Sequence, residues 1–388
     1  MAVDARFDKI QRVEHHPNAD TLDIATVSNF PCIVKRGEFN EGDWCFYIRD
    51  DAKLIGYDEL KCREERDREA ARTGAFVTQD CFTCTFQWQD PLLKYLGNGG
   101  RVKTIKLRGR TSMGILLKPD VVLNVFIYNG RNVVSDENIE WFNEQFKKEY
   151  GGLFLENNFG IKHWEMPVSG CSMGDISVIG PLVNGLWKTD EENYQNIEDE
   201  LFPWNEEVLI TKKLDGTSCS ISASPDGDVH VMSRSMDLKL DVDNVYTKAA
   251  KDIIPLVVSL AKYYNERVVV RGEVTGNGIN ANKVNLDCKG DISFNMFSVV
   301  FPDSDDESKR IGLYGTEWHF LEVNKKCKEL TGYEIKTVPI EGTCILTRQL
   351  LDEISDRPRS EGEGRVINTK SIVLPHFKSK SKDYLAHL

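Results

Sequence analysis

The segment Ile210–Ser218, which reads Ile-Thr-Lys-Lys-Leu-Asp-Gly-Thr-Ser, decides how the rest of this chain is interpreted. It contains the pattern Lys213-x-Asp215-Gly216. A lysine attacks a phosphorus atom only when its amine is neutral, and lowering its pKa from about 10.4 to about 7–8 costs roughly 4 kcal/mol. This pattern arises by chance in about one chain in ten of this length. Asp-Gly is also a common hairpin turn, so the interpretation depends on further motifs.

Length and composition indicate an ordinary globular protein with room for two domains. The chain has 388 residues, of which 40% are hydrophobic and 28% are charged. No apolar run approaches the ~20 residues of a membrane span, and the N-terminus lacks a signal-peptide core. The ten cysteines have no disulfide framework spacing, and Cys81-x-x-Cys84 lacks the partners of a zinc site. We therefore expect a reducing, cytoplasmic location and no membrane.

The net charge of −12 argues against nucleic acid as a partner, but the local distribution of charge matters more. Five cations fall within ten residues, and we predict that they bind nucleic acid: Arg101, Lys103, Lys106, Arg108 and Arg110. The alternative is a solvated basic strand with no ligand, and periodicity alone does not separate the two.

Residues 1–127 alternate β-type runs with glycine turns, which fits a small OB-type β-barrel. Val102–Leu107 and Met113–Leu117 are expected to pair with each other. Residues 62–98 are interpreted as an insertion. Residues 128–185 are interpreted as a linker or an extension, with a helix at Glu137–Tyr150.

In residues 186–388 the pattern changes to strands alternating with helices, and we predict a second domain there. Ser224-Pro-Asp-Gly227 predicts a hairpin. The other expected elements are strands at Thr217–Ser222, Val229–Arg234, Val268–Glu273, Ile292–Phe301, Arg365–Ile367 and Ile372–Leu374, and helices at Thr247–Tyr264, kinked at Pro255, and at Leu346–Ile354.

Four further strings follow Lys213 in an order that chance does not readily supply. Ser233-Arg234-Ser235 ends a strand, and Arg271-Gly-Glu273 ends an apolar strand beside a glycine-rich turn. Phe294-Asn-Met-Phe297 could stack on a purine. Glu361-Gly-Glu363-Gly-Arg365 and Phe377-Lys-Ser-Lys380 supply a carboxylate for a divalent metal and cations for phosphates.

This ordered set resembles the covalent nucleotidyltransferase superfamily of polynucleotide ligases and capping enzymes, and within it an ATP-dependent RNA ligase with an N-terminal OB domain. The resemblance covers most of residues 186–388 and, more loosely, residues 7–127. It implies an α+β fold, with the OB-type barrel followed by a nucleotidyltransferase domain of antiparallel sheets and flanking helices. Capping enzymes and most DNA ligases place an OB domain after the last lysine motif, and only eight residues follow Lys380 here.

Site roles follow from the resemblance. Lys213 would be the nucleophile that carries AMP. The other implied roles are ATP contacts by Thr211, Lys212, Arg234, Glu273, Phe297, Lys378 and Lys380, with Lys378 and Lys380 also catalytic, and metal contacts by Glu361, Glu273 and Asp215. Two positions depart from the pattern. Lys212 stands where these ligases often have Glu, and Ser298 replaces a common acid. A cation at position 212 could instead depress the pKa of Lys213.

The sequence thus predicts an ATP- and Mg²⁺- (or Mn²⁺-) dependent RNA ligase that seals 3′-hydroxyl/5′-phosphate breaks in RNA or RNA–DNA duplexes, without an obligate protein partner. The alternatives are an adenylyltransferase or DNA ligase with another acceptor, and a nucleic-acid-binding protein whose nucleotidyltransferase domain is inactive.

Overall fold

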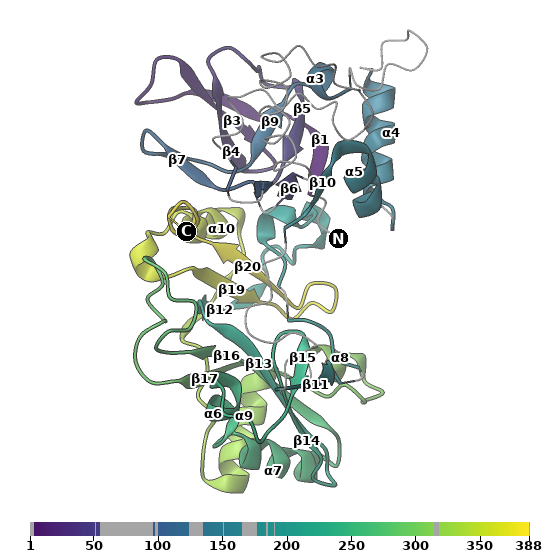
Figure 1. The fold of residues 1–388 in the computed structure, drawn as a ribbon, viewed down its shortest axis with the longest axis vertical. Coiled ribbons are helices and arrows are strands. Elements are labelled where there is room, and N and C mark those ends of the chain that lie inside the picture. The colour runs from purple at the N-terminus through teal and green to yellow at the C-terminus, as the bar shows by residue number, and fades with distance from the viewer. Residues whose placement is uncertain are drawn as a thin grey trace, which may run out of the picture. The chain divides into compact units, whose positions relative to one another are not determined.

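The computed structural model describes residues 4–50, 52–54, 96–97, 100–123, 135–149, 151–164, 177–183, 185–189, 191–313 and 318–387. The chain divides into two compact units, Met1–Met166 and Pro167–Leu388, and each is described by itself (Figure 1). Of the predicted insertion at 62–98, residues 96–97 alone are described, so Cys62, Cys81 and Cys84 lie outside the described residues. In the described parts of the chain, no helix has the length and apolar character needed to cross a membrane.

The first unit consists of small antiparallel sheets and three helices among its described residues. The strands are β1 (Ala5–Lys9), β2 (Arg12–His15), β3 (Leu22–Val27), β4 (Phe30–Lys35), β5 (Trp44–Ile48), β6 (Ala52–Leu54), β7 (Ile105–Leu107), β8 (Arg110–Ser112), β9 (Ile115–Leu117) and β10 (Ile161–His163). The sheet orders are β1-β5-β9, β2-β3-β4, β10-β6 and β7-β8. The helices are α3 (Pro119–Leu123), α4 (Asp136–Lys147) and α5 (Gly151–Phe159).

Aromatic side chains from strands and helices form the core of this unit. Phe7 of β1 and Phe46 of β5 have ring centroids 4.8 Å apart, and Phe142 and Phe146 of α4 join them. Helix α4, predicted at Glu137–Tyr150, begins at Asp136 because the Ser135 hydroxyl accepts a hydrogen bond from the Asn138 amide at 3.3 Å.

The predicted pairing of Val102–Leu107 with Met113–Leu117 is wrong. Strand β7 pairs with β8, whereas β9 pairs with β5. The reason is the turn between β7 and β8: Arg108 and Gly109 have φ of 44° and 87°. Two successive left-handed residues are typical of a two-residue hairpin turn, which brings Leu107 directly opposite Arg110.

The second unit contains two larger antiparallel sheets. Its strands are β11 (Val178–Pro181), β12 (Glu207–Lys213), β13 (Thr217–Ala223), β14 (Val229–Met232), β15 (Met236–Leu238), β16 (Val268–Thr275), β17 (Ser293–Val300), β18 (Ile340–Ile345), β19 (Gly364–Asn368) and β20 (His376–Lys380). The sheet orders are β11-β15-β14-β13-β16-β17 and β18-β12-β19-β20.

Helices cover both sheets of the second unit. They are α6 (Val245–Ala250), α7 (Ile254–Tyr264), α8 (Glu307–Ile311), α9 (His319–Thr331), α10 (Arg348–Ser355) and α11 (Lys382–Leu385); short 3₁₀ turns are η4 (Tyr194–Asn196), η5 (Asp199–Leu201) and η6 (Arg359–Glu361). Helices α6, α7 and α9 share one apolar core with β13, β14, β16 and β17 (Figure 1). Helix α10 packs in a second core with β12, β19 and β20.

Most predicted elements of this unit are present, with two corrections. The hairpin of β13 and β14 is confirmed. The single helix predicted at Thr247–Tyr264 is two helices, because Pro255 lies in the first turn of α7, where its missing amide costs nothing. Ile372–Leu374 is not a strand; the chain turns there, and β20 begins at His376. Helix α9 was not predicted.

Candidate active site

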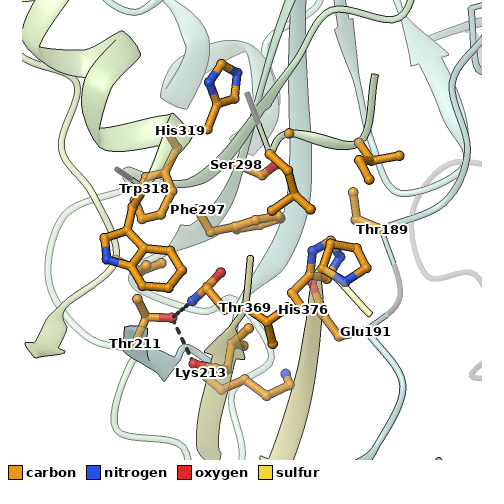
Figure 2. Close-up of a pocket in the computed structure, with 18 of the residues that line it drawn as sticks. Thr189, Glu191, Thr211, Lys213, Phe297, Ser298, Trp318, His319, Thr369 and His376 are labelled. Atoms are coloured by element: carbon orange, nitrogen blue, oxygen red, sulfur yellow. Dashed lines mark hydrogen bonds between the residues drawn. The ribbon is translucent and has the colours of Figure 1, made fainter. Parts of the chain in front are cut away.

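The second unit contains a cavity of about 160 Å³ to which both sheets contribute. Strand β12 supplies Thr211 and Lys213, β16 supplies Glu273 and β17 supplies Phe297. Figure 2 shows the Phe297 ring in the middle of the cavity, with Trp318 to one side and Lys213 below it in that view. Five segments that are remote in sequence therefore meet here: Glu191, Lys213, Glu273, Phe297 and His376.

Strand geometry explains why Lys213 faces the cavity. Side chains alternate along a strand, so Thr211 and Lys213 share one face of β12. Thr211 is bound to β19 on that face: its hydroxyl donates to the Val366 carbonyl and accepts from the Asn368 amide, both at 3.4 Å. Lys212 also contributes to the cavity lining, and its amine donates to the Asp287 carboxylate at 2.9 Å.

A compact charged cluster surrounds the Lys213 amine. Lys213 Nζ lies 2.7 Å from Glu363 Oε2, and Lys380 Nζ lies 3.3 Å from Glu363 Oε1. The Glu363 side chain is only 9% exposed, so a single buried carboxylate bridges two lysines. Glu273, from the next sheet, accepts the Gly216 amide at 3.1 Å.

The charges in the cluster perturb one another. Burial alone would raise the pKa of Glu363, but the positive charges of Lys213 and Lys380 lower it to about 2. Burial alone would lower the pKa of Lys213, but Glu363 and then Glu273 raise it above its ordinary value. Lys213 is therefore held as an ammonium in this state. The expected depression of its pKa by Lys212 is not found, since Lys212 is paired with Asp287.

Lys378 and Glu273, near this cluster, have pKa values shifted toward pH 7. Burial, reinforced by the charges of Lys380 and Lys213, lowers the pKa of Lys378 to about 8. Burial raises the pKa of Glu273 to about 8, although Lys213 opposes that change. Ionisable groups displaced in this way concentrate at functional sites.

The structure does not bring Glu361 to Lys213. Glu361 ends the turn η6, its side chain is 46% exposed, and it lies 3.6 Å from Arg357 and 3.5 Å from Arg365. Glu363 occupies the place expected for Glu361. It directly precedes β19, and its carbonyl accepts the Ser381 amide at 2.8 Å, which aligns it with β20. Adjacency to the apolar strand was the sequence signal that favoured Glu363.

Arg234 also lies apart from the cluster. It is exposed in the turn between β14 and β15 and is not among the described residues that line the cavity. Phe297, the residue that the resemblance implies for adenine stacking, does line it, and so does Ser298.

Asp215 is surrounded by hydrogen-bond donors that sequence reasoning missed. Its carboxylate accepts the Tyr384 hydroxyl, the Asn280 amide at 3.3 Å and the Asn282 amide at 3.5 Å. Burial and then the charge of Glu363 raise its pKa. The asparagines belong to the loop after the glycine-rich turn. Their high frequency in that loop was the sequence signal that could have indicated hydrogen-bond donors for Asp215.

The basic run lies in the first unit. Lys103 precedes β7, Lys106 is on β7, Arg108 is in the turn and Arg110 is on β8, and all four are exposed. Arg101 is half-buried, with its guanidinium 3.8 Å from the centre of the Trp164 ring. The four exposed cations therefore share one hairpin and its entry, whereas Arg101 packs against its own unit.

Two family models match separate parts of the chain. Residues 206–381 match a family model described as RNA ligase, and residues 5–75 match an OB-fold domain model. These matches confirm the two predicted domain types. No curated protein sequence matched the chain.

Solved structures of Naegleria gruberi RNA ligase have a similar fold. A mutant with ATP and manganese is 20% identical with a TM-score of 0.68, covering 98% of this chain and 98% of that chain. A mutant with AMP and manganese is 21% identical with a TM-score of 0.67, covering 98% of each chain. The enzyme with pyrophosphate is 21% identical with a TM-score of 0.65, covering 99% of this chain and 98% of that one. At these identities the likeness establishes the fold, and the α+β prediction is confirmed.

Proposed function

We propose that this chain, whose residues 206–381 form a domain of the RNA ligase family, is an ATP-dependent RNA ligase that joins a 3′-hydroxyl to a 5′-phosphate through a lysyl-AMP intermediate. The observation that carries the proposal is the ion-paired cluster of Lys213, Glu363 and Lys380, in which Lys213 also lines the cavity that contains Phe297.

The residues present fit ATP and a divalent cation. Mg²⁺ prefers oxygen ligands and is usually held by one or two carboxylates together with substrate phosphates. Glu363 and Glu273 are carboxylates of this kind, and Lys378 and Lys380 provide cations for phosphate oxygens. The bound metal would supply charge neutralisation on the α-phosphate and the leaving pyrophosphate. The solved Naegleria enzyme with ATP and manganese supports this combination of ligands.

The first step of the reaction begins with the proton on Lys213. The ammonium cannot attack phosphorus, and Glu363 stabilises it in the absence of ligands. Glu363 would hold the divalent cation, whose charge would weaken the pairing of Glu363 with Lys213, and the burial of Lys213 favours its neutral amine. The neutral Nζ attacks the α-phosphorus, a P–N bond forms, and the P–O bond to pyrophosphate breaks. The displaced proton leaves with solvent.

Other residues orient the nucleotide. The Phe297 ring offers a face on which adenine can stack, and Val366 of β19 lines the same cavity. Glu273 would contact the ribose or a metal-bound water. The AMP then moves from Lys213 to the 5′-phosphate of the RNA, and the 3′-hydroxyl displaces AMP to seal the strand.

The first unit is proposed to bind the nucleic acid. Its match to an OB-fold domain and its exposed cations Lys103, Lys106, Arg108 and Arg110 support this role. OB folds commonly hold nucleic acid on one face, with cations following the phosphate backbone.

The test is to incubate the protein with α-labelled ATP and Mg²⁺, denature it, and ask whether the label stays on the chain. Lys213→Ala and Lys213→Arg should abolish labelling, the latter because a guanidinium stays protonated. Lys262→Arg, an exposed position on α7, is the matched control and should label normally. Label that persists in either Lys213 variant would refute the proposal. Label that forms but never moves to nicked RNA would indicate a different acceptor.

A further inference from the structure

The loop between β16 and β17 binds the peptide that follows the proposed nucleophile. The amide of Asp215 donates to Asp287 Oδ2 at 3.1 Å, and the carbonyl of Asp215 accepts from Asn285 Nδ2 at 2.9 Å. The carbonyl of Gly216 accepts from Asn280. Side chains of Asn280, Asn285 and Asp287 thus bind three backbone polar groups of the turn between β12 and β13.

Asp287 makes a second contact on the other side of Lys213. Its Oδ1 accepts the Lys212 amine at 2.9 Å, and the two side chains are 13% and 21% exposed. The same carboxylate therefore holds residue 212 by its side chain and residue 215 by its backbone. Asp287 is itself fixed, because its amide donates to Asn285 at 2.7 Å and its carbonyl accepts the Gly276 amide at 3.1 Å.

This bridge restricts how Lys213 can turn. Since side chains alternate along β12, holding the Lys212 side chain against Asp287 places the Lys213 side chain on the opposite face of the strand, toward Glu363. The turn packs so closely against β16 that position 216 cannot hold a side chain. A Cβ at Gly216 would lie 2.2 Å from the Val274 carbonyl oxygen. We propose that Asp287 is a positioning residue for the nucleophile, holding the 212–215 backbone so that Lys213 faces the cavity before ATP binds. This inference rests on the proposed function.

The role applies to one step of the reaction. Formation of lysyl-AMP needs the Lys213 amine in line with the leaving pyrophosphate, and small misplacements of a reacting group cost large factors in rate. Sealing of an RNA strand that already carries AMP does not use Lys213 as a nucleophile. A positioning role therefore affects the two steps differently, whereas a general loss of folding affects both.

The test compares variants of the full chain in both steps. Asp287→Ala should lower the rate of lysyl-AMP formation at saturating ATP by about 10- to 100-fold. The KM for ATP should change little, and sealing of a pre-adenylylated nick should proceed at the normal rate. Asp287→Asn keeps an oxygen for the Asp215 amide but loses the charge facing Lys212, so its rate should be intermediate. Lys212→Gln should resemble Asp287→Asn, since both break the same ion pair.

Asn324→Ala is the matched control for stability. Asn324 is a buried side chain of the same unit that binds both polar groups of the Ile335 peptide, each at 2.8 Å. It should lower the melting temperature without changing the labelling rate. Equal losses in both steps for Asp287→Asn, or normal labelling by folded Asp287→Ala, would overturn the proposal. Absence of labelling in the unaltered protein would refute the proposed function, and this inference with it.

Discussion

Glu361 and Glu363 offer a matched pair of carboxylates, two residues apart, that tests how the site works. The proposed perturbation is Glu363→Gln, with Glu361→Gln as the control. Glutamine resembles the protonated form of glutamate, so the change in stability follows from the preference of the fold for the Glu363 carboxylate. The pKa of Glu363 is lowered from 4.5 to about 2, which corresponds to about 3 kcal/mol.

The pH dependence of this difference has a definite sign. A carboxyl group whose pKa is lowered in the folded state contributes stability above its unfolded value of 4.5, and that contribution is lost as pH falls toward 2. We therefore expect Glu363→Gln to lower the free energy of unfolding by about 3 kcal/mol at pH 7, with a smaller difference below pH 4.5. Glu361→Gln should cost less than about 1 kcal/mol, because the Glu361 side chain is 46% exposed and its arginine contacts are long, at 3.6 and 3.5 Å.

The labelling activity of Glu363→Gln depends on two opposing effects of this substitution. Removing Glu363 also removes the largest charge that keeps Lys213 protonated, so labelling would become faster if deprotonation alone limited the reaction. We expect the loss of charge stabilisation in the transition state to dominate and to slow labelling by about 10²- to 10³-fold. Urea unfolding at several pH values and labelling with α-labelled ATP measure both quantities. Equal stability losses in the two variants, or lost labelling in Glu361→Gln alone, would refute this reasoning.

Three further outcomes are expected. Phe297→Ala should raise the KM for ATP by an amount equivalent to roughly 1–3 kcal/mol of stacking, whereas Phe297→Tyr should retain binding; equal KM values in labelling assays would exclude the stacking role. Burial raises the pKa of Glu273 to about 8, so the carboxylate destabilises the fold progressively between pH 4.5 and 8, and Glu273→Gln should stabilise the protein more at pH 8 than at pH 5 in thermal unfolding. A triple change of Lys106→Gln, Arg108→Asn and Arg110→Gln should weaken binding to nicked duplex. It should also reduce the slope of log affinity against log salt concentration by about 0.9 for each lost phosphate contact. Asparagine suits position 108 because φ there is 44°, and normal binding by the folded variant would show that the basic hairpin is only a solvated face.

Local sequence determined the chemical inventory of this protein and most of its elements. The nucleophile motif, the aromatic strand and the paired lysines are short segments, and their order along the chain carries the resemblance to the nucleotidyltransferases. The hairpin at Ser224–Gly227 depends on turn chemistry within a few residues. The OB-type and ligase-type domains were predicted without coordinates because these segments resemble those of known families.

Tertiary structure decided which of these residues meet. Glu361 and Glu363 differ in sequence mainly in their distance from the following strand, and the pairing of β19 with β12 and β20 places Glu363 against Lys213, 150 residues away. The contacts of Asp287 with Lys212 and of Tyr384 with Asp215 span 75 and 169 residues and have no sequence pattern. The ionisation of Lys213 was also decided there. Its pKa depends on the balance between burial and the neighbouring carboxylates, Glu363 first, and that balance exists only once the chain has folded.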